Sequence, residues 1–163
     1  QDDDALLQDV GQRLRACIGL VHPVILRTGT IPPMQHLLPK DAWALLQANE
    51  DARLIDIRME IESMYVGRPP GAINVPWYEY PDFTPNAQAF CQTVLSEIHR
   101  KDHPVLLLCR SGQRTLDAGQ ALEAEGFTQV INILHGFEGD LNDKFHRSAL
   151  NGWRHDGLPW EQM

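Results

Sequence analysis

Residues 105–119 read VLLLCRSGQRTLDAG, an apolar run that ends on a cysteine and is followed at once by a polar, cationic turn. A continuous apolar run of this length is typical of a central parallel strand that is covered on both faces. A helix is predicted directly after the turn, over residues 114–125, and Gly126 is well suited to end it. This order of strand, turn and helix places Cys109 at the carboxyl end of a central strand, where ligands bind in open α/β sheets.

The remaining chain continues the alternation of short apolar strands and amphipathic helices, with no internal repeat. This alternation predicts an α/β sandwich with a mainly parallel sheet. A length of 163 residues suits one such domain. The predicted strands are residues 53–57, 71–76 and 128–134, and the further helices are residues 40–48, 60–66 and 86–100.

Residues 1–35 are expected to form a helical extension and an arm that precede a catalytic domain at 36–163. An apolar stripe at helical spacing predicts a helix over residues 3–19, and several prolines up to Pro39 predict an arm that wraps the domain. We expect the stripe to pack onto the catalytic domain or onto a second subunit, because its exposure to water would be unfavourable.

The composition excludes several partners. The net charge of −8 argues against nucleic acid, whose phosphates require a basic surface. No apolar stretch approaches the roughly 20 residues of a membrane-spanning helix.

A free catalytic thiol suits the reducing cytoplasm, whereas the non-methionine start and the acidic N-terminus suit an exported protein whose signal was removed. Of the two compartments, we expect the periplasm.

Three cysteines cannot all pair within one chain, so at least one is a free thiol or bonds elsewhere. Cys17 and Cys91 lie on apolar helical stripes and are expected to be small buried hydrophobes. Cys109 differs, because it opens a polar loop. No CxxC or Cys/His spacing typical of zinc is present, and we expect neither a metal nor a cofactor.

The loop after Cys109 has the chemistry that stabilises a thiolate. Gly112 allows the backbone to curl, so that successive amide N–H groups can converge on the sulfur as an anion-binding nest. The positive end of the following helix points to the same place, and Arg110 and Arg114 add full charges. A thiolate is the nucleophilic form of cysteine, so Cys109 is the predicted catalytic residue.

Five segments carry a resemblance to a known family. They are LIDIR at 54–58, GRPPGAINVP at 67–76, the cysteine loop at 109–114, GFTQVINI at 126–133 and GLPW at 157–160. In this order they resemble the rhodanese family of sulfurtransferases, over roughly residues 37–163. The resemblance implies a three-layer sandwich with a mainly parallel central sheet flanked by helices.

The resemblance also implies a reaction. Cys109 would take the outer sulfur of thiosulfate as a persulfide and pass it to cyanide, a low-molecular-weight thiol or a protein thiol. Arg110 is the candidate for holding the sulfonate of the donor, and Arg114 is expected to close the loop and add positive potential. Asp56 and Arg58 would brace the loop or form a purely structural ion pair. The other expected substrate-binding residues are Ser111, Gly112, Gln113 and Thr115.

The chain departs from the family pattern at several positions. Arg68 and Pro69 stand where the family often has histidine and isoleucine, and the double glycine after the last strand is replaced by HGFEGD. An insertion at 136–152 sets the tail tryptophan, Trp153, further back. None of these positions lies in the cysteine loop.

The length of the cysteine loop distinguishes the alternative functions. The related dual-specificity phosphatases of the cell cycle have five residues between cysteine and arginine, whereas this chain has four between Cys109 and Arg114. The smaller ring favours one sulfur atom over the tetrahedral oxyanion of a Cys-based phosphatase or arsenate reductase. Mercaptopyruvate sulfurtransferases tend to have a neutral loop, so Arg110 favours thiosulfate. The main alternative is a rhodanese module that only binds partners or relays sulfur without turnover.

Overall fold

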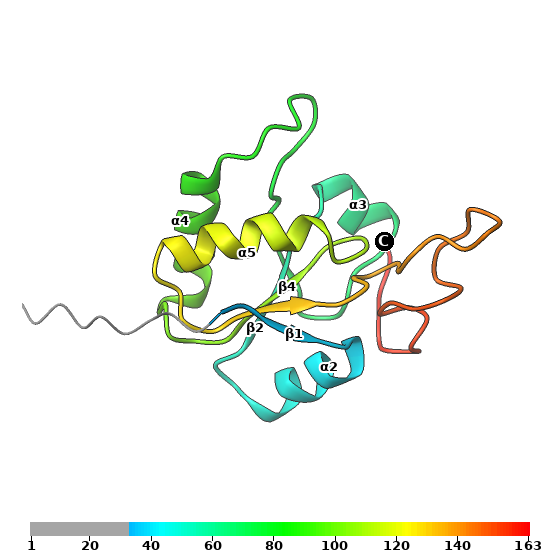
Figure 1. The fold of residues 1–163 in the computed structure, drawn as a ribbon, viewed down its shortest axis with the longest axis horizontal. Coiled ribbons are helices and arrows are strands. Elements are labelled where there is room, and N and C mark those ends of the chain that lie inside the picture. The colour runs from blue at the N-terminus through cyan, green and yellow to red at the C-terminus, as the bar shows by residue number, and fades with distance from the viewer. Residues whose placement is uncertain (1–32) are drawn as a thin grey trace, which may run out of the picture. The chain divides into compact units, whose positions relative to one another are not determined.

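The computed structural model describes residues 33–163, which fold around a five-stranded sheet (Figure 1). The strands are β1 (Gln35–Leu37), β2 (Arg53–Asp56), β3 (Ile73–Asn74), β4 (Val105–Leu108) and β5 (Val130–Ile133). The helices are α2 (Pro39–Ala48), α3 (Glu60–Tyr65), α4 (Ala87–Ile98) and α5 (Arg114–Ala124). The predicted α/β fold with a parallel central sheet is confirmed.

The sheet has the order β1-β5-β4-β2-β3, and each neighbouring pair is parallel. β4 is therefore central, with β5 on one side and β2 on the other. Parallel strands that point the same way bring their carboxyl ends to one edge, which is where a ligand site is expected. In Figure 1 this edge is the right-hand end of the sheet, where the cysteine loop, α3 and the tail meet.

Side chains alternate between the two faces of β4 and divide the core in two. Val105 and Leu107 pack toward α4 and α5, whereas Leu106 and Leu108 pack toward α2 and the tail. All four are completely buried, as the continuous apolar run predicts. Figure 1 shows α4 and α5 on one side of the sheet and α2 on the other, so helices cover both faces.

The sequence interpretation was wrong in one segment. The arm predicted up to Pro39 contains a strand, β1, which pairs in parallel with β5 at the edge of the sheet. The sheet thus takes in Gln35, the last residue of the extension predicted at 1–35. The helix predicted over residues 3–19 lies outside the described residues.

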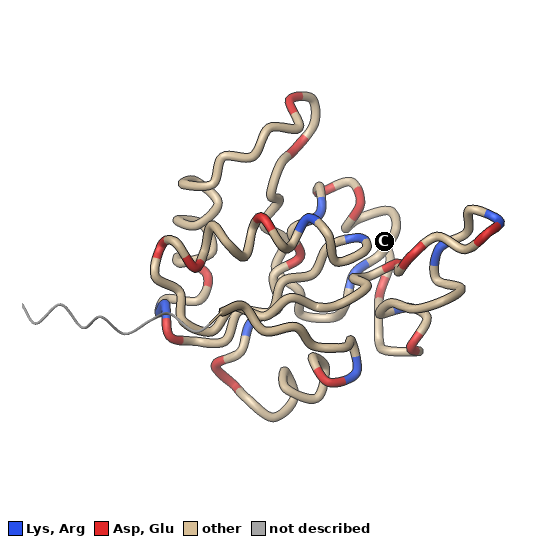
Figure 2. The backbone as a smooth tube through the Cα atoms, in the orientation of Figure 1, with Lys and Arg blue, Asp and Glu red and all other residues tan. Residues whose placement is uncertain are grey.

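Figure 2 shows that the Lys, Arg, Asp and Glu residues lie mainly in loops and helices. β1, β4 and β5 carry none. Among the helices that the structure describes, none is both long and apolar enough to cross a membrane.

Candidate active site

Cys109 lies directly after β4, at the carboxyl edge of the sheet. By the alternation of the strand its side chain falls on the same face as Val105 and Leu107, toward α5. Only 1% of the residue is exposed. The sulfur is therefore recessed beneath its own loop.

The loop curls around this sulfur at Gly112. The backbone N–H of Gly112 donates a hydrogen bond to Cys109 Sγ at 3.1 Å. Gly112 has a φ of +84°, a conformation that side-chain-bearing residues rarely adopt, so the turn that aims this N–H at the sulfur depends on glycine. The 11-residue helix α5 then begins at Arg114 and presents its positive end to the same region.

A buried hydroxyl also reaches the sulfur. Thr115 Oγ1 lies 3.8 Å from Cys109 Sγ and donates a hydrogen bond to Asn132 Oδ1 at 2.6 Å. Asn132 Nδ2 in turn lies 3.1 Å from Nδ1 of His36. Thr115 and Asn132 are both buried, whereas His36 is exposed on the edge strand. A continuous line of polar groups therefore leads from the sulfur to the edge of the sheet.

The segment after β5 holds the start of the loop. Phe137 N–H donates to the carbonyl of Cys109 at 2.8 Å, and Glu138 N–H donates to that of Arg110 at 2.9 Å. Gly136, with a φ of +58°, lies so close that a Cβ atom there would collide with the Cys109 carbonyl oxygen. The HGFEGD segment, a departure from the family pattern, thus still supplies glycine where the backbones meet.

Arg114 ties the end of the loop to α3. Both of its terminal nitrogens donate to the carboxylate of Glu62, each at 2.7 Å, and its guanidinium lies 5.5 Å from the centre of the Tyr78 ring. Burial opposes the ionised form of Glu62, but the hydrogen bonds and charge of Arg114, the Met59 N–H and Arg58 outweigh it, so the pKa of Glu62 lies below its ordinary value. Burial likewise opposes the Arg114 cation, yet the bonds and charge of Glu62 raise the pKa of Arg114. Arg114 therefore links the end of the loop to α3, while Glu62 balances its charge.

The other predicted loop residues differ in exposure. Arg110 and Gln113 are exposed, and Ser111 is half-buried. Within residues 33–163, Arg110 pairs with no acid. Arg110 thus places a positive charge next to the cysteine that no acidic side chain of residues 33–163 pairs with.

The comparisons with known proteins agree with this geometry. A family model described as "Rhodanese-like domain" matches residues 38–143. The chain belongs to the rhodanese-like family. An uncharacterized protein of Rickettsia conorii is 31% identical over 134 residues, which cover 78% of this chain and 98% of the relative.

Two further relatives of this rhodanese-like chain are informative. The thiosulfate sulfurtransferase GlpE of Glaesserella parasuis is 33% identical over 103 residues, which cover 63% of this chain and 82% of the relative. The crystal structure of Rv0390 from M. tuberculosis superposes with a TM-score of 0.66 at 37% identity, covering 79% of this chain and 98% of that one. Family membership and these relatives support an enzyme of the sulfurtransferase type.

Asp56 and Arg58 form a buried ion pair in the rhodanese-like domain. The Arg58 guanidinium donates to both carboxylate oxygens of Asp56, at 2.9 and 2.6 Å, and to the carbonyl of Gly67 at 2.7 Å. It also lies 4.4 Å from the centre of the Phe137 ring. Because Phe137 holds the Cys109 carbonyl, the pair contacts the loop through this ring and not directly. Whether it braces the loop in function stays a prediction.

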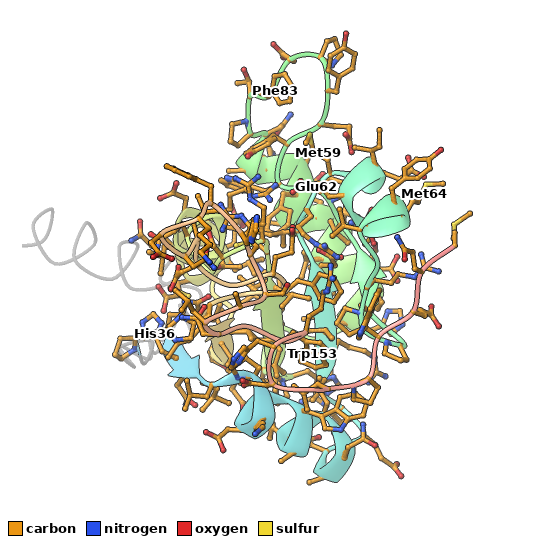
Figure 3. All side chains as sticks on the ribbon, turned by 90° about the vertical axis from the view of Figure 1, so that its right-hand side faces the viewer. His36, Met59, Glu62, Met64, Phe83 and Trp153 are labelled. Atoms are coloured by element: carbon orange, nitrogen blue, oxygen red, sulfur yellow. The ribbon has the colours of Figure 1, made fainter. Side chains whose placement is uncertain are left out.

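Sequence reasoning missed three residues of the site: His36, Glu62 and Asn132. Figure 3 faces the carboxyl edge and shows Glu62 on α3 and His36 on β1. Asn132 had a signal that could have been used, since it is the polar residue inside the apolar strand VINI. Neither His36 nor Glu62 had such a signal, because both belong to segments that look like ordinary surface.

The second described cysteine has a different environment. Cys91 is buried on α4, and this burial, followed by the charge of Glu125, raises the pKa of its thiol despite Lys101. A thiol with a raised pKa is less ionised at neutral pH and is a poor nucleophile. Among residues 33–163, no group of three or more His, Cys, Asp or Glu side chains is arranged to hold a metal.

Proposed function

We propose that the protein is a thiosulfate sulfurtransferase that carries sulfane sulfur as a persulfide on Cys109. The observation that carries the proposal is the recessed position of Cys109, a residue that is 1% exposed and whose sulfur accepts a hydrogen bond from the Gly112 N–H at 3.1 Å. A narrow donor that ends in a single sulfur atom suits such a sulfur better than a bulky tetrahedral oxyanion. The family and the GlpE relative support the same reaction class.

The first half-reaction needs no general base if the thiolate is already formed. The Cys109 thiolate attacks the outer sulfur of thiosulfate, a new S–S bond forms, and the original S–S bond breaks with its electron pair leaving on sulfite. The Gly112 N–H and the end of α5 stabilise negative charge on sulfur before and after transfer. In the second half-reaction the acceptor attacks the outer sulfur of the persulfide, and the Cys109 thiolate is released. With cyanide as acceptor the product is thiocyanate.

Arg110 is the proposed residue for binding the donor. Its side chain is exposed beside the loop and is paired with no acid of the described residues, so its charge is available to the sulfonate of thiosulfate. Arg114 cannot take this role without giving up its two bonds to Glu62. We therefore assign donor capture to Arg110 and loop closure to Arg114.

The test combines turnover with direct detection of the persulfide. Wild type should form thiocyanate from thiosulfate and cyanide, and mass spectrometry after thiosulfate alone should show one added sulfur on the Cys109 peptide. Cys109→Ser should abolish both signals, because a hydroxyl forms no persulfide. Cys91→Ser is the matched control and should retain both, since Cys91 lies buried on α4.

The outcomes separate the alternatives. Thiocyanate formation by Cys109→Ser would refute the mechanism. A sulfur adduct on Cys91 or Cys17 instead of Cys109 would show that another cysteine carries the persulfide. A persulfide on Cys109 without turnover to cyanide or low-molecular-weight thiols would identify a relay to a protein acceptor. Hydrolysis of p-nitrophenyl phosphate or reduction of arsenate without any persulfide would identify the phosphatase or arsenate reductase alternative.

A further inference from the structure

The line of polar groups behind Cys109 has no role in the transfer chemistry above. Its members lie on three separate elements: Thr115 on the first turn of α5, Asn132 on β5 and His36 on β1. The parallel register places His36 directly opposite Asn132. Leu37 and Ile133 pack toward α2, so strand alternation turns His36 and Asn132 toward α5, where Thr115 begins the helix.

Each hydrogen bond in this line constrains the next. The hydroxyl of Thr115 has one proton, so it can donate to Asn132 or to the sulfur but not to both. In the observed arrangement it donates to Asn132 Oδ1, which leaves Asn132 Nδ2 facing His36 Nδ1. A lone pair of the hydroxyl then faces Cys109 Sγ at 3.8 Å, an arrangement that can accept a hydrogen bond from the S–H group of a neutral thiol.

We propose that Asn132 and His36 are positioning residues that reverse the direction of this hydrogen-bond line when Cys109 ionises. When the thiol proton leaves to solvent, the Asn132 amide turns over, so that Nδ2 donates to Thr115 and Oδ1 accepts from His36. The Thr115 hydroxyl is then free to donate to the anionic sulfur. Every group remains hydrogen-bonded in both directions, because amide, hydroxyl and imidazole can each donate and accept.

His36 makes the reversal possible because it meets water. When His36 Nδ1 faces Asn132 Nδ2, it must accept a hydrogen bond. When it faces Asn132 Oδ1, the same nitrogen must carry a proton. The neutral ring satisfies both by moving its proton between Nδ1 and Nε2 through solvent, and its exposure on β1 allows this exchange. The described charges flanking the sulfur, Arg110 and the Arg114–Glu62 pair, are unchanged by the reversal.

The proposal deepens the proposed function and rests on it only for the role of the Cys109 sulfur. The test therefore measures the reactivity of the sulfur directly, as the rate at which iodoacetamide alkylates the Cys109 peptide at each pH. His36→Glu can only accept a hydrogen bond from Asn132, so the Thr115 hydroxyl keeps donating to Asn132, and the midpoint of the pH profile should rise. His36→Lys can only donate to Asn132, so the Thr115 hydroxyl is free to donate to the sulfur, and the midpoint should fall. A hydrogen bond of about 1 kcal/mol corresponds to a shift of about 0.7 pH units.

A second substitution separates the hydrogen-bond line from the charge introduced at position 36. Thr115→Val removes the hydroxyl while keeping the shape of the side chain. In that background the shifts caused by His36→Glu and His36→Lys should fall to less than about a third. Shifts of equal size with and without the hydroxyl would mean that charge acts through space, and an absence of shifts would mean that the line does not reach the sulfur. Either result overturns the proposal.

A measurement on the unmodified chain does not depend on how the variants fold. Nitrogen-15 NMR of the His36 ring should show the proton moving from Nε2 to Nδ1 over the pH range in which Cys109 becomes reactive. Cys109→Ser should abolish this coupled change. A ring that keeps its Nε2 proton throughout would contradict the reversal. Failure of thiosulfate turnover, by contrast, would refute only the proposed function.

Discussion

Replacing Glu62 with glutamine should destabilise the fold by an amount that depends on pH. The carboxylate holds both terminal nitrogens of Arg114 at 2.7 Å, and the two side chains are only 13% and 16% exposed. Hydrogen bonds to charged groups contribute about 1.5–3 kcal/mol. Glutamine keeps one acceptor and loses the charge, so we expect Glu62→Gln to lose about 2 kcal/mol at pH 7. For a chain of this size the melting temperature should fall by about 4–8 °C.

The pH dependence follows from the direction of the pKa shift. Because folding lowers the pKa of Glu62, its contribution is fully present above the pKa of the unfolded chain, about 4.3, and is lost as the pH falls through the folded value. Thermal melts of wild type and Glu62→Gln should therefore differ most above about pH 5 and converge in more acidic buffer.

Glu60→Gln is the matched control for this prediction. It removes the same charge from the same helix, but its side chain is exposed and makes no hydrogen bond among the described residues. Glu60→Gln should change the melting temperature by little, since exposed positions contribute within about 0.5 kcal/mol. Equal melting temperatures for Glu62→Gln and Glu60→Gln at pH 7 would show that the bond to Arg114 does not stabilise the fold.

Two further substitutions test the loop. Arg110→Ala should lower kcat/KM for thiosulfate by roughly one to two orders of magnitude, because it removes a charged hydrogen bond to the donor. Lys144→Ala is the control, since it removes an exposed positive charge outside the cysteine loop. Equal kinetics of the two variants would exclude a role of Arg110 in binding the donor. Gly136→Ala should lower the melting temperature more than Gly126→Ala. Both glycines have positive φ, but only at Gly136 would a Cβ collide, with the carbonyl of Cys109, whereas Gly126 faces open space. If both variants lowered the melting temperature equally, backbone strain alone would account for the loss of stability and the collision at Gly136 would not contribute.

Most of the sheet could be predicted from local patterns. The run VLLLC predicts a strand covered on both faces, and β4 is completely buried between α2 and the pair α4 and α5. β1 could not be predicted in this way, because QHL is short, lies near prolines and has no apolar alternation. Its extended conformation is stabilised by pairing with β5, almost a hundred residues later in the chain.

The residues of the site likewise fall into those that could be predicted from local sequence and those that could not. Cys109 and Gly112 were predicted because their chemistry lies within one continuous stretch, and the structure places the Gly112 N–H on the sulfur. Glu62 could not be assigned to Arg114, because no periodicity links residues 52 positions apart. His36 and Asn132 were likewise missed, since their contact arises from the register of two strands.

The strand, the turn and the helix around Cys109 follow from local sequence, because backbone conformation, glycine placement and a helix start depend on neighbours in the chain. The groups that surround this segment come from distant parts of the chain and depend on the tertiary fold. The order β1-β5-β4-β2-β3 brings β5 to one side of the cysteine strand and β2 to the other. It thereby sets Asn132 and His36 behind the sulfur, while packing at the same sheet edge brings Glu62 to Arg114. These contacts depend on burial and strand pairing between distant segments, and such pairings exist only once the sheet has formed.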